Sequence, residues 1–199
     1  MQRCNRIVAD LLSFARRHTP ERALMDVTEL LTATLAMRDR HLQAKGVWPR
    51  LCVDLGLPKV VADAHQLQQV VLNIIINAEH ALRESGKTLR INAERVTRPA
   101  GPPAGEWLAI RIDTDGPPIP REARAKIFEP FFTTKAKDEG TGLGLAICLR
   151  IVRDHGGTID VESGDDGTTF TILLPVPAET VGEEAEGEAE GSPGQRLAS

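Results

Sequence analysis

The chain has 199 residues, of which 41% are hydrophobic and 26% charged, so one globular domain with short appendages is expected and two large domains are excluded. The formal net charge of −4 is uneven, because the segment 179–199 holds six glutamates and one arginine. The remainder carries only about +1, which argues against the basic face of a nucleic-acid-binding protein.

Apolar residues at helical spacing dominate the first half of the chain. Three helices are expected in this half. Pro20 ends the first, the second ends near Gly46, and Gly86 follows the third and longest as its terminator. Short alternating stretches between them predict strands. In chain order we expect a helix over 3–17, a helix over about 27–44, a strand over 47–53, a helix over about 64–85 and a strand over 89–93.

The second half begins with a clean alternation of Leu108, Ile110 and Ile112, which predicts a strand. Beyond Pro177 the chain is rich in Glu, Ala and Gly, and we expect a disordered tail because such a segment buries little apolar surface. The other elements expected are a turn over 116–120, a short helix over 121–127, a flexible segment to Gly144, a helix over 145–155, and strands over 158–162 and 169–174. Together they predict a mixed sheet with helices over one face, an α/β two-layer sandwich.

The helix over 64–85 has two distinct faces. At 100° per residue, its polar residues Gln69, Asn73, Asn77 and His80 share an arc of about 80°. Two asparagines one turn apart are unusual on a solvated face, because asparagine is a poor helix former, and their amide oxygens can bind a hard cation or a polar ligand. A solvated face remains the alternative. The buried arc is expected to hold Leu67, Val70, Val71, Ile74, Ile75, Ala78 and Leu82.

A glycine-rich run leads into the helix that begins near Leu145. Alternating glycines let the backbone approach a ligand closely, and the N–H groups of a helix start suit an anion such as phosphate. The run lacks the Gly-Lys-Ser/Thr of a Walker A motif and does not follow a strand. Lys135 could add positive charge near a polyphosphate, or it could be a solvated lysine. The run consists of Gly140, Thr141, Gly142, Leu143 and Gly144.

Four blocks in this order resemble the catalytic, ATP-binding domain of bacterial sensor histidine kinases, a family related to gyrase, the Hsp90 chaperones and MutL. The resemblance covers roughly residues 63–175 and implies a Bergerat-type sandwich with ATP between the asparagine helix and a mobile lid. The blocks are Asn73 to Ala78, Asp115 to Pro120, Ile127 to Lys135, and Gly140 to Leu145.

The resemblance implies a role for each matched position. Asn77 is expected to ligate the Mg²⁺ that bridges the ATP phosphates, with Asn73 on the same phosphate side and Thr168 near the adenine. The glycines of the 140–144 run are expected to contact phosphate through their backbone, and Phe131 and Phe132 to anchor the lid. The remaining nucleotide-binding positions expected are His80, Thr114, Asp115, Gly116, Ile119, Lys135, Thr141 and Leu143.

Asn73 bears on the reaction. ATPase relatives place a glutamate there to activate water, and an amide cannot act as a general base, so direct hydrolysis is expected to be poor. That favours a kinase that positions the γ-phosphate for transfer to a histidine on another domain. An ATPase of the same superfamily stays as an alternative.

The block around Gly116 departs from the family pattern Asp-x-Gly-x-Gly. Thr114 stands where the adenine-binding Asp is expected, and Pro118 replaces the second glycine. Strand parity puts Thr114 on the side of Ile112, and turns Asp113 and Asp115 to the other face unless a bulge intervenes. Loss of a charge-assisted hydrogen bond predicts affinity lower by about ten- to a hundredfold. A degenerate module that binds partners without phosphotransfer is therefore a further alternative.

No histidine of this chain is followed by Glu or Asp, as a phosphoacceptor usually is. We expect residues 1–18 to be the second helix of a dimerisation and phosphoacceptor hairpin, 19–177 the catalytic domain and 178–199 the acidic tail. The expected partners are that hairpin, a response regulator and a second copy in the full-length protein, with no nucleic acid. Three widely spaced cysteines and no long apolar run favour a cytoplasmic location, compatible with a membrane-anchored parent protein.

Overall fold

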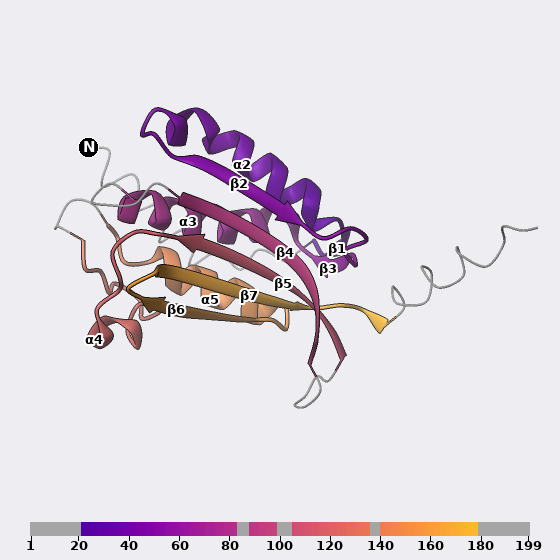
Figure 1. The fold of residues 1–199 in the computed structure, drawn as a ribbon. Helices are drawn as coiled ribbons and strands as arrows, with labels where there is room; N and C mark the ends of the chain where they lie inside the picture. The colour runs from indigo at the N-terminus through magenta and orange to yellow at the C-terminus, as the bar shows by residue number, and fades with distance from the viewer. Residues whose placement is uncertain (1–20, 83–87, 99–104, 136–139, 179–199) are drawn as a thin grey trace, which may run out of the picture.

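The computed structural model describes residues 21–82, 88–98, 105–135 and 140–178 (Figure 1). The predicted helix over 3–17, the last residues of the helix over 64–85 and the tail beyond 178 lie outside these ranges. The helices are α2 (Val27–Gln43), α3 (Ala64–Leu82), α4 (Arg121–Arg124) and α5 (Gly144–Asp154). The strands are β1 (Ala23–Met25), β2 (Trp48–Val53), β3 (Val60–Ala62), β4 (Thr88–Arg98), β5 (Gly105–Thr114), β6 (Thr158–Gly164) and β7 (Gly167–Pro175).

Five strands form one sheet in the order β2-β4-β5-β7-β6. β2 runs parallel to β4 and the other neighbours are antiparallel, so the predicted mixed sheet is confirmed. The alternation of the strands sets their register: Ile112 of β5 lies opposite Ile91 of β4 and Phe170 of β7. These side chains share one face, and α2, α3 and α5 pack side by side against it, with α3 in the middle. The predicted two-layer sandwich is confirmed.

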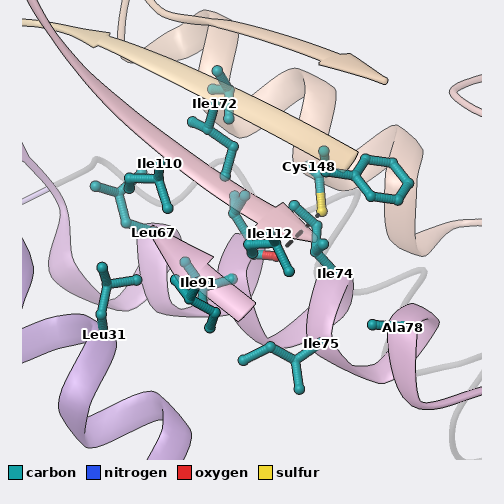
Figure 2. Close-up of a cluster of buried hydrophobic side chains, with 14 of the residues drawn as sticks. Leu31, Leu67, Ile74, Ile75, Ala78, Ile91, Ile110, Ile112, Cys148 and Ile172 are labelled. Carbon is teal, nitrogen blue, oxygen red and sulfur yellow. Dashed lines mark hydrogen bonds between the residues drawn. The ribbon is translucent and has the colours of Figure 1, made fainter. Parts of the chain in front are cut away.

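The core lies between the sheet and α3. All seven residues of the predicted buried arc are buried, and Ile74 and Ile75 are fully so. Figure 2 shows part of this arc in one cluster with Ile91, Ile110, Ile112 and Ile172 of the sheet. Burial of each such side chain contributes roughly 1.5–3 kcal/mol relative to exposure. Because α3 turns this arc to the sheet, its amide stripe is left at the edge of the layer.

Two buried groups tie the start of α3 to the end of α5. The Asp63 carboxylate accepts a hydrogen bond from the Gln66 backbone N–H at 3.0 Å, which caps α3. The Asp63 backbone N–H in turn donates to Nε2 of His155 at 3.0 Å, and His155 Nδ1 is 2.7 Å from the Ile151 carbonyl oxygen. The imidazole is therefore a neutral bridge that fixes where α3 begins.

The structure corrects some boundaries. A separate antiparallel pair, β1 with β3, was not predicted, because three-residue strands give no periodic signal. The short helix predicted over 121–127 ends at Arg124, and residues 125–127 form turns that place Ile127 in the core. Cys52 and Cys148 are free thiols. Within the described ranges, no helix combines the length and apolar character needed to cross a bilayer.

Candidate functional site

The two asparagines of the predicted stripe contact the glycine-rich segment. Asn73 Nδ2 donates to the carbonyl oxygen of Gly144 at 3.3 Å, where α5 begins. One turn further along α3, Asn77 Oδ1 accepts a hydrogen bond from Lys135 Nζ at 2.9 Å. Both asparagines are half-buried rather than solvated. Residues 58 and 71 positions apart in the sequence therefore meet at one edge of α3.

The base of the glycine segment is held by backbone contacts. The Phe131 N–H donates to the Gly142 carbonyl oxygen at 2.9 Å. Gly142 has φ +68°, and a Cβ there would lie 2.4 Å from the carbonyl carbon of Phe131, so only glycine fits. Phe131 itself has a positive φ and its ring is exposed, so it anchors the segment through its backbone, while the Phe132 ring packs on the core.

The start of α5 lacks a side-chain cap. Leu143 occupies the N-cap position without a side-chain hydrogen bond from it, and its own N–H donates to Thr141 Oγ1 at 3.4 Å. Gly140 lies against Thr133, whose hydroxyl would be 2.9 Å from a Cβ at this position. An uncapped helix start with small neighbours can offer backbone N–H groups to an anion, and phosphate binding at this segment stays a prediction.

A chain of hydroxyl groups lies at the end of β5. Thr114 Oγ1 donates to the Thr168 carbonyl oxygen at 3.3 Å, and both threonines are only 8% exposed. Thr168 Oγ1 is 2.7 Å from Ser163 Oγ, which also accepts from the Ile119 N–H at 2.8 Å. The predicted positions 114, 119 and 168 are thus brought together, and Ser163 joins them although the sequence did not single it out.

The neighbouring carboxylates point elsewhere. Asp113 accepts from Asn92 Nδ2 at 2.7 Å and from Thr169 Oγ1 at 2.8 Å, on the opposite face of the sheet. Asp115 accepts from the Thr88 N–H at 2.8 Å. The strands pair residue for residue up to Thr114, so no bulge rotates Asp113 toward the helices. The prediction from strand parity is confirmed for Asp113, whereas Asp115 lies beyond the end of β5.

These parts follow one edge of α3. Gly144 meets Asn73, Lys135 meets Asn77, and Gly116 lies against Ala81, where a Cβ would come within 3.2 Å of the Ala81 Cβ. The three helix positions are four residues apart, so they span about 12 Å. His80, half-buried, belongs to the same stripe. The arrangement is a strip with an anion-attracting end at the glycines and a hydroxyl-lined end at Thr114.

Two cavities lie away from this strip. One of 520 Å³ is lined by residues including Met25, Leu30 and His65, and one of 370 Å³ by Lys45, Val47, Glu79 and Leu82. None of the predicted nucleotide-binding residues lines either cavity. In the strip itself, Lys135 and Gly144 lie on the two asparagines.

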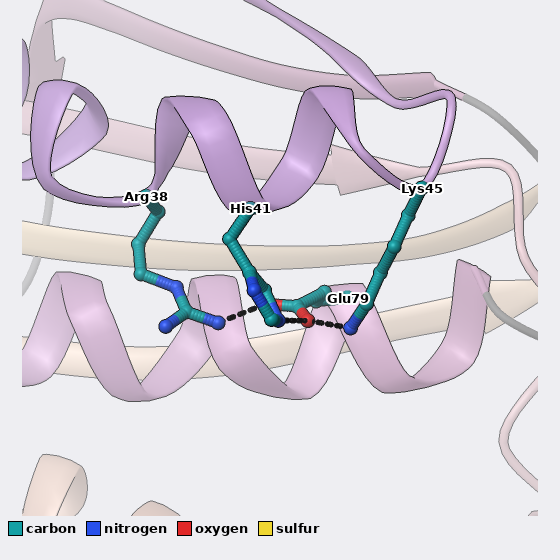
Figure 3. Close-up of polar contacts among 4 residues, drawn as sticks. All are labelled: Arg38, His41, Lys45 and Glu79. Carbon is teal, nitrogen blue, oxygen red and sulfur yellow. Dashed lines mark hydrogen bonds and ion pairs between the residues drawn. The ribbon is translucent and has the colours of Figure 1, made fainter.

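Sequence reasoning missed an ionic cluster between α2 and α3 (Figure 3). Glu79 is buried and pairs with Arg38, Lys45 and His41, whose Nε2 is 2.9 Å from Oε1. Burial would raise the pKa of Glu79, but hydrogen bonds from Lys45 and Arg38 together with their positive charge lower the pKa to about 2. Arg38 and His41, three residues apart near the end of α2, were the signal that the sequence offered.

The buried thiol of Cys148 also touches the stripe from the core side. Its Sγ donates to the Val70 carbonyl oxygen at 3.7 Å, as the dashed line in Figure 2 shows. Burial raises the pKa of Cys148 to about 12, against the lowering by a hydrogen bond with Asn73. The thiol is therefore unreactive at neutral pH and has a packing role.

The donor set suits a magnesium–phosphate ligand better than a metal held by protein alone. Among the described residues, no cluster of three or more His, Cys, Asp or Glu could hold an ion. The Asn77 amide oxygen nevertheless faces a cation, the Lys135 ammonium. One amide oxygen together with phosphate oxygens and water is a usual Mg²⁺ environment, so the residues fit that ion.

Comparison with known proteins gives a consistent result. Residues 62–178 match the family described as histidine kinase-, DNA gyrase B- and HSP90-like ATPases. The chain is 37% identical over 177 residues to the sensor kinase CckA of Brucella abortus, covering 85% of this chain and 18% of CckA. It is 34% identical over 175 residues to the sensor histidine kinase ZraS of Escherichia coli, covering 87% of this chain and 35% of ZraS. The chain thus spans about a fifth to a third of these relatives.

Solved structures of a histidine kinase are similar to this chain as well. The catalytic domain of the histidine kinase ThkA superposes with a TM-score of 0.69 at 32% identity, covering 80% of this chain and 99% of that domain. ThkA in complex with the response regulator protein TrrA superposes with a TM-score of 0.72 at 28% identity, covering 89% of this chain and 48% of ThkA.

Proposed function

The chain belongs to the histidine kinase-, DNA gyrase B- and HSP90-like ATPase family, and from that premise we propose that it is the catalytic domain of a two-component sensor histidine kinase. In this role it transfers the γ-phosphate of ATP to a histidine on a helical hairpin. The observation that carries the proposal is the meeting of Asn73 and Asn77 with Gly144 and Lys135 along α3.

The residues of the strip have separate tasks. Asn77 would hold the Mg²⁺ that accompanies ATP, and the ion neutralises phosphate charge when bound. Lys135 supplies further positive charge to the phosphates, and the backbone of the 140–144 segment donates hydrogen bonds to them. Gly116 allows the base to approach, with Thr114, Ile119, Thr168 and His80 beside it, whereas Asp115 of the same block is engaged by the Thr88 N–H. Asn73 positions the segment through Gly144.

The side chain of Asn73 decides between transfer and hydrolysis. A carboxamide cannot take a proton from water, so bound ATP should hydrolyse slowly. The enzyme then contributes positioning and charge neutralisation, and the nucleophile comes from a second domain. This feature supports a kinase over an ATPase.

The domain boundaries and partners are part of the same proposal. Residues 1–18 are the end of the dimerisation and phosphoacceptor hairpin, 19–177 the catalytic domain and 178–199 an acidic tail. The hairpin receives the phosphate, a response regulator takes it on, and the full-length protein is a homodimer with this domain in the cytoplasm. The ThkA complex with TrrA supports the second partner.

A transfer assay tests the proposal. The chain is mixed with Mg-ATP and a separately produced histidine-bearing hairpin of the parent kinase, beside the same hairpin with its histidine replaced by alanine. Acid-labile phosphate on the first hairpin alone is the expected result. Free phosphate without labelled hairpin would instead indicate an ATPase.

A second candidate, a nucleotide-binding or partner-binding module without phosphotransfer, rests on one feature of the sequence. Thr114 and Pro118 replace two positions of the base-binding block. Absence of both labelled hairpin and free phosphate, with the chain folded, would support this candidate.

A further inference from the structure

At the end of the strip proposed for the nucleotide base, the side chain of Thr114 carries a hydroxyl. A carboxylate at this position would only accept hydrogen bonds and would therefore select a base with an amino group. Thr114 is the last residue of β5, is only 8% exposed, and turns its side chain to the helix side of the sheet. A carboxylate accepts hydrogen bonds and donates none when ionised, whereas a hydroxyl does both. The identity of this one side chain therefore decides which purine edge can bind.

Neither aspartate next to Thr114 in the sequence takes over the missing role. Asp113 is held on the far face by Asn92 and Thr169, at 2.7 and 2.8 Å. Asp115 is engaged by the Thr88 backbone N–H. Turning Asp113 inward would break two side-chain hydrogen bonds and shift the pairing with both neighbouring strands.

The hydroxyls present can reverse their direction. The bond from Thr114 Oγ1 to the Thr168 carbonyl oxygen is 3.3 Å long, beyond the usual range for O–H···O, so little is lost when this proton turns elsewhere. Between Thr168 Oγ1 and Ser163 Oγ, 2.7 Å apart, either atom can donate. Thr114 can therefore present a donor or an acceptor, and so can the separate pair of hydroxyls on Thr168 and Ser163.

Adenine and the 6-oxopurines differ in the hydrogen-bonding groups that they carry at C6 and N1. Adenine offers an amino donor at C6 and an acceptor at N1, whereas a 6-oxopurine offers a keto acceptor at C6 and a donor at N1. We propose that this site binds 6-oxopurine nucleoside triphosphates about as well as ATP, and that Thr114 is the residue that sets this tolerance. The inference rests on the proposed function, which places the base beside Thr114.

The test compares ATP with inosine triphosphate, which carries the keto group in place of the amino group. Equilibrium dissociation constants of both Mg-nucleotides are measured by calorimetry on the full chain. We expect the two constants to agree within tenfold. A preference for ATP beyond tenfold would overturn the inference and leave the proposed function standing. Binding of neither nucleotide would instead remove the proposed function and the inference with it.

Variants of Thr114 test whether this residue sets the preference between the two nucleotides. Thr114→Asp should raise the preference for ATP by about ten- to a hundredfold, because the carboxylate accepts from the amino group and repels the keto oxygen. Thr114→Ser keeps the hydroxyl and should still bind the two nucleotides about equally. This variant also tests the role of Thr114 if Thr114→Asp does not fold. Thr171→Val, on the face of β7 that is turned away from the helices, is the matched control. The role of Thr114 would be refuted if the ratio of the two dissociation constants were unchanged in folded Thr114→Asp or changed in Thr114→Ser.

Discussion

At the scale of single residues, the site depends on amides and hydroxyls where related chemistry uses carboxylates. Asn73 cannot act as a base, and Thr114 cannot offer a charged acceptor. The nearby aspartates do not compensate, because Asp113 and Asp115 are engaged outside the strip. In the proposed site, the nucleotide would therefore be held by positioning contacts and by cations.

The amide of Asn77 gives the sharpest prediction for a single side chain. Asn77→Ala removes the oxygen that faces the Lys135 ammonium and the expected Mg²⁺, so Mg-dependent nucleotide binding should be abolished. Calorimetric titration with an ATP analogue, in Mg²⁺ and in EDTA, measures this. The matched control is Gln68→Ala, an amide of the same helix that contacts Met37 instead. Retained Mg-dependent binding in Asn77→Ala would show that the metal role is misassigned.

At the scale of elements, α3 is positioned from both sides. Its start is tied to α5 through Asp63 and His155, and its last turns are tied to α2 through Glu79. Neither contact touches the strip, yet both fix where the amides lie. Figure 3 shows Arg38, His41 and Lys45 converging on the one carboxylate.

The cluster at Glu79 predicts a dependence of stability on pH. The folded pKa of about 2 lies below the unfolded value of 4.5, so the stabilisation is complete above about pH 4.5 and is lost as the pH falls through about 2. The shift corresponds to about 3 kcal/mol in the free energy of unfolding. Denaturant unfolding from pH 7 to pH 2.5 should show the difference between wild type and Glu79→Gln shrinking with acid. The exposed Glu162→Gln is the control, and a pH-independent difference would contradict the assignment.

The glycine segment gives a second prediction at this scale. Gly142→Ala forces a Cβ to within 2.4 Å of the Phe131 carbonyl carbon, at φ +68°, so the segment should lose its anchor and nucleotide affinity should fall at least about tenfold. Gly46→Ala is matched in strain, with φ +74°, but meets nothing within 4 Å. It should cost about 1 kcal/mol in stability and leave affinity unchanged. Equal affinity in both variants would argue against the anchor.

At the scale of the whole molecule, the hydrophobic core of the described residues falls inside the range proposed for the catalytic domain. Among the described residues, every buried member of the core cluster lies between Val27 and Leu174. Strands far apart in sequence close the sheet, and α2, α3 and α5 cover one face of it (Figure 1).

The domain boundaries can therefore be tested by truncation. A fragment of residues 19–177 should unfold within about 2 °C of the full chain, because it keeps the whole core cluster. Thermal unfolding followed by circular dichroism measures both. A midpoint lower by more than about 4 °C would mean that the removed segments contribute packing.

The sequence alone determined the repeating features. Helical spacing fixed the buried arc of α3, and strand alternation fixed the face on which Thr114 lies, because both depend only on backbone periodicity. The order of the four blocks determined the family. Contacts between distant segments carry no such periodic signal.

Tertiary structure decided the rest. The pairing of β1 with β3, the ionic cluster at Glu79 and the position of Lys135 on Asn77 all join residues tens of positions apart. Such contacts form only when packing brings two elements together, and a side chain's partner then depends on the relative placement of both. For that reason the sequence could name the residues of the strip but not which atom of each faces its neighbour.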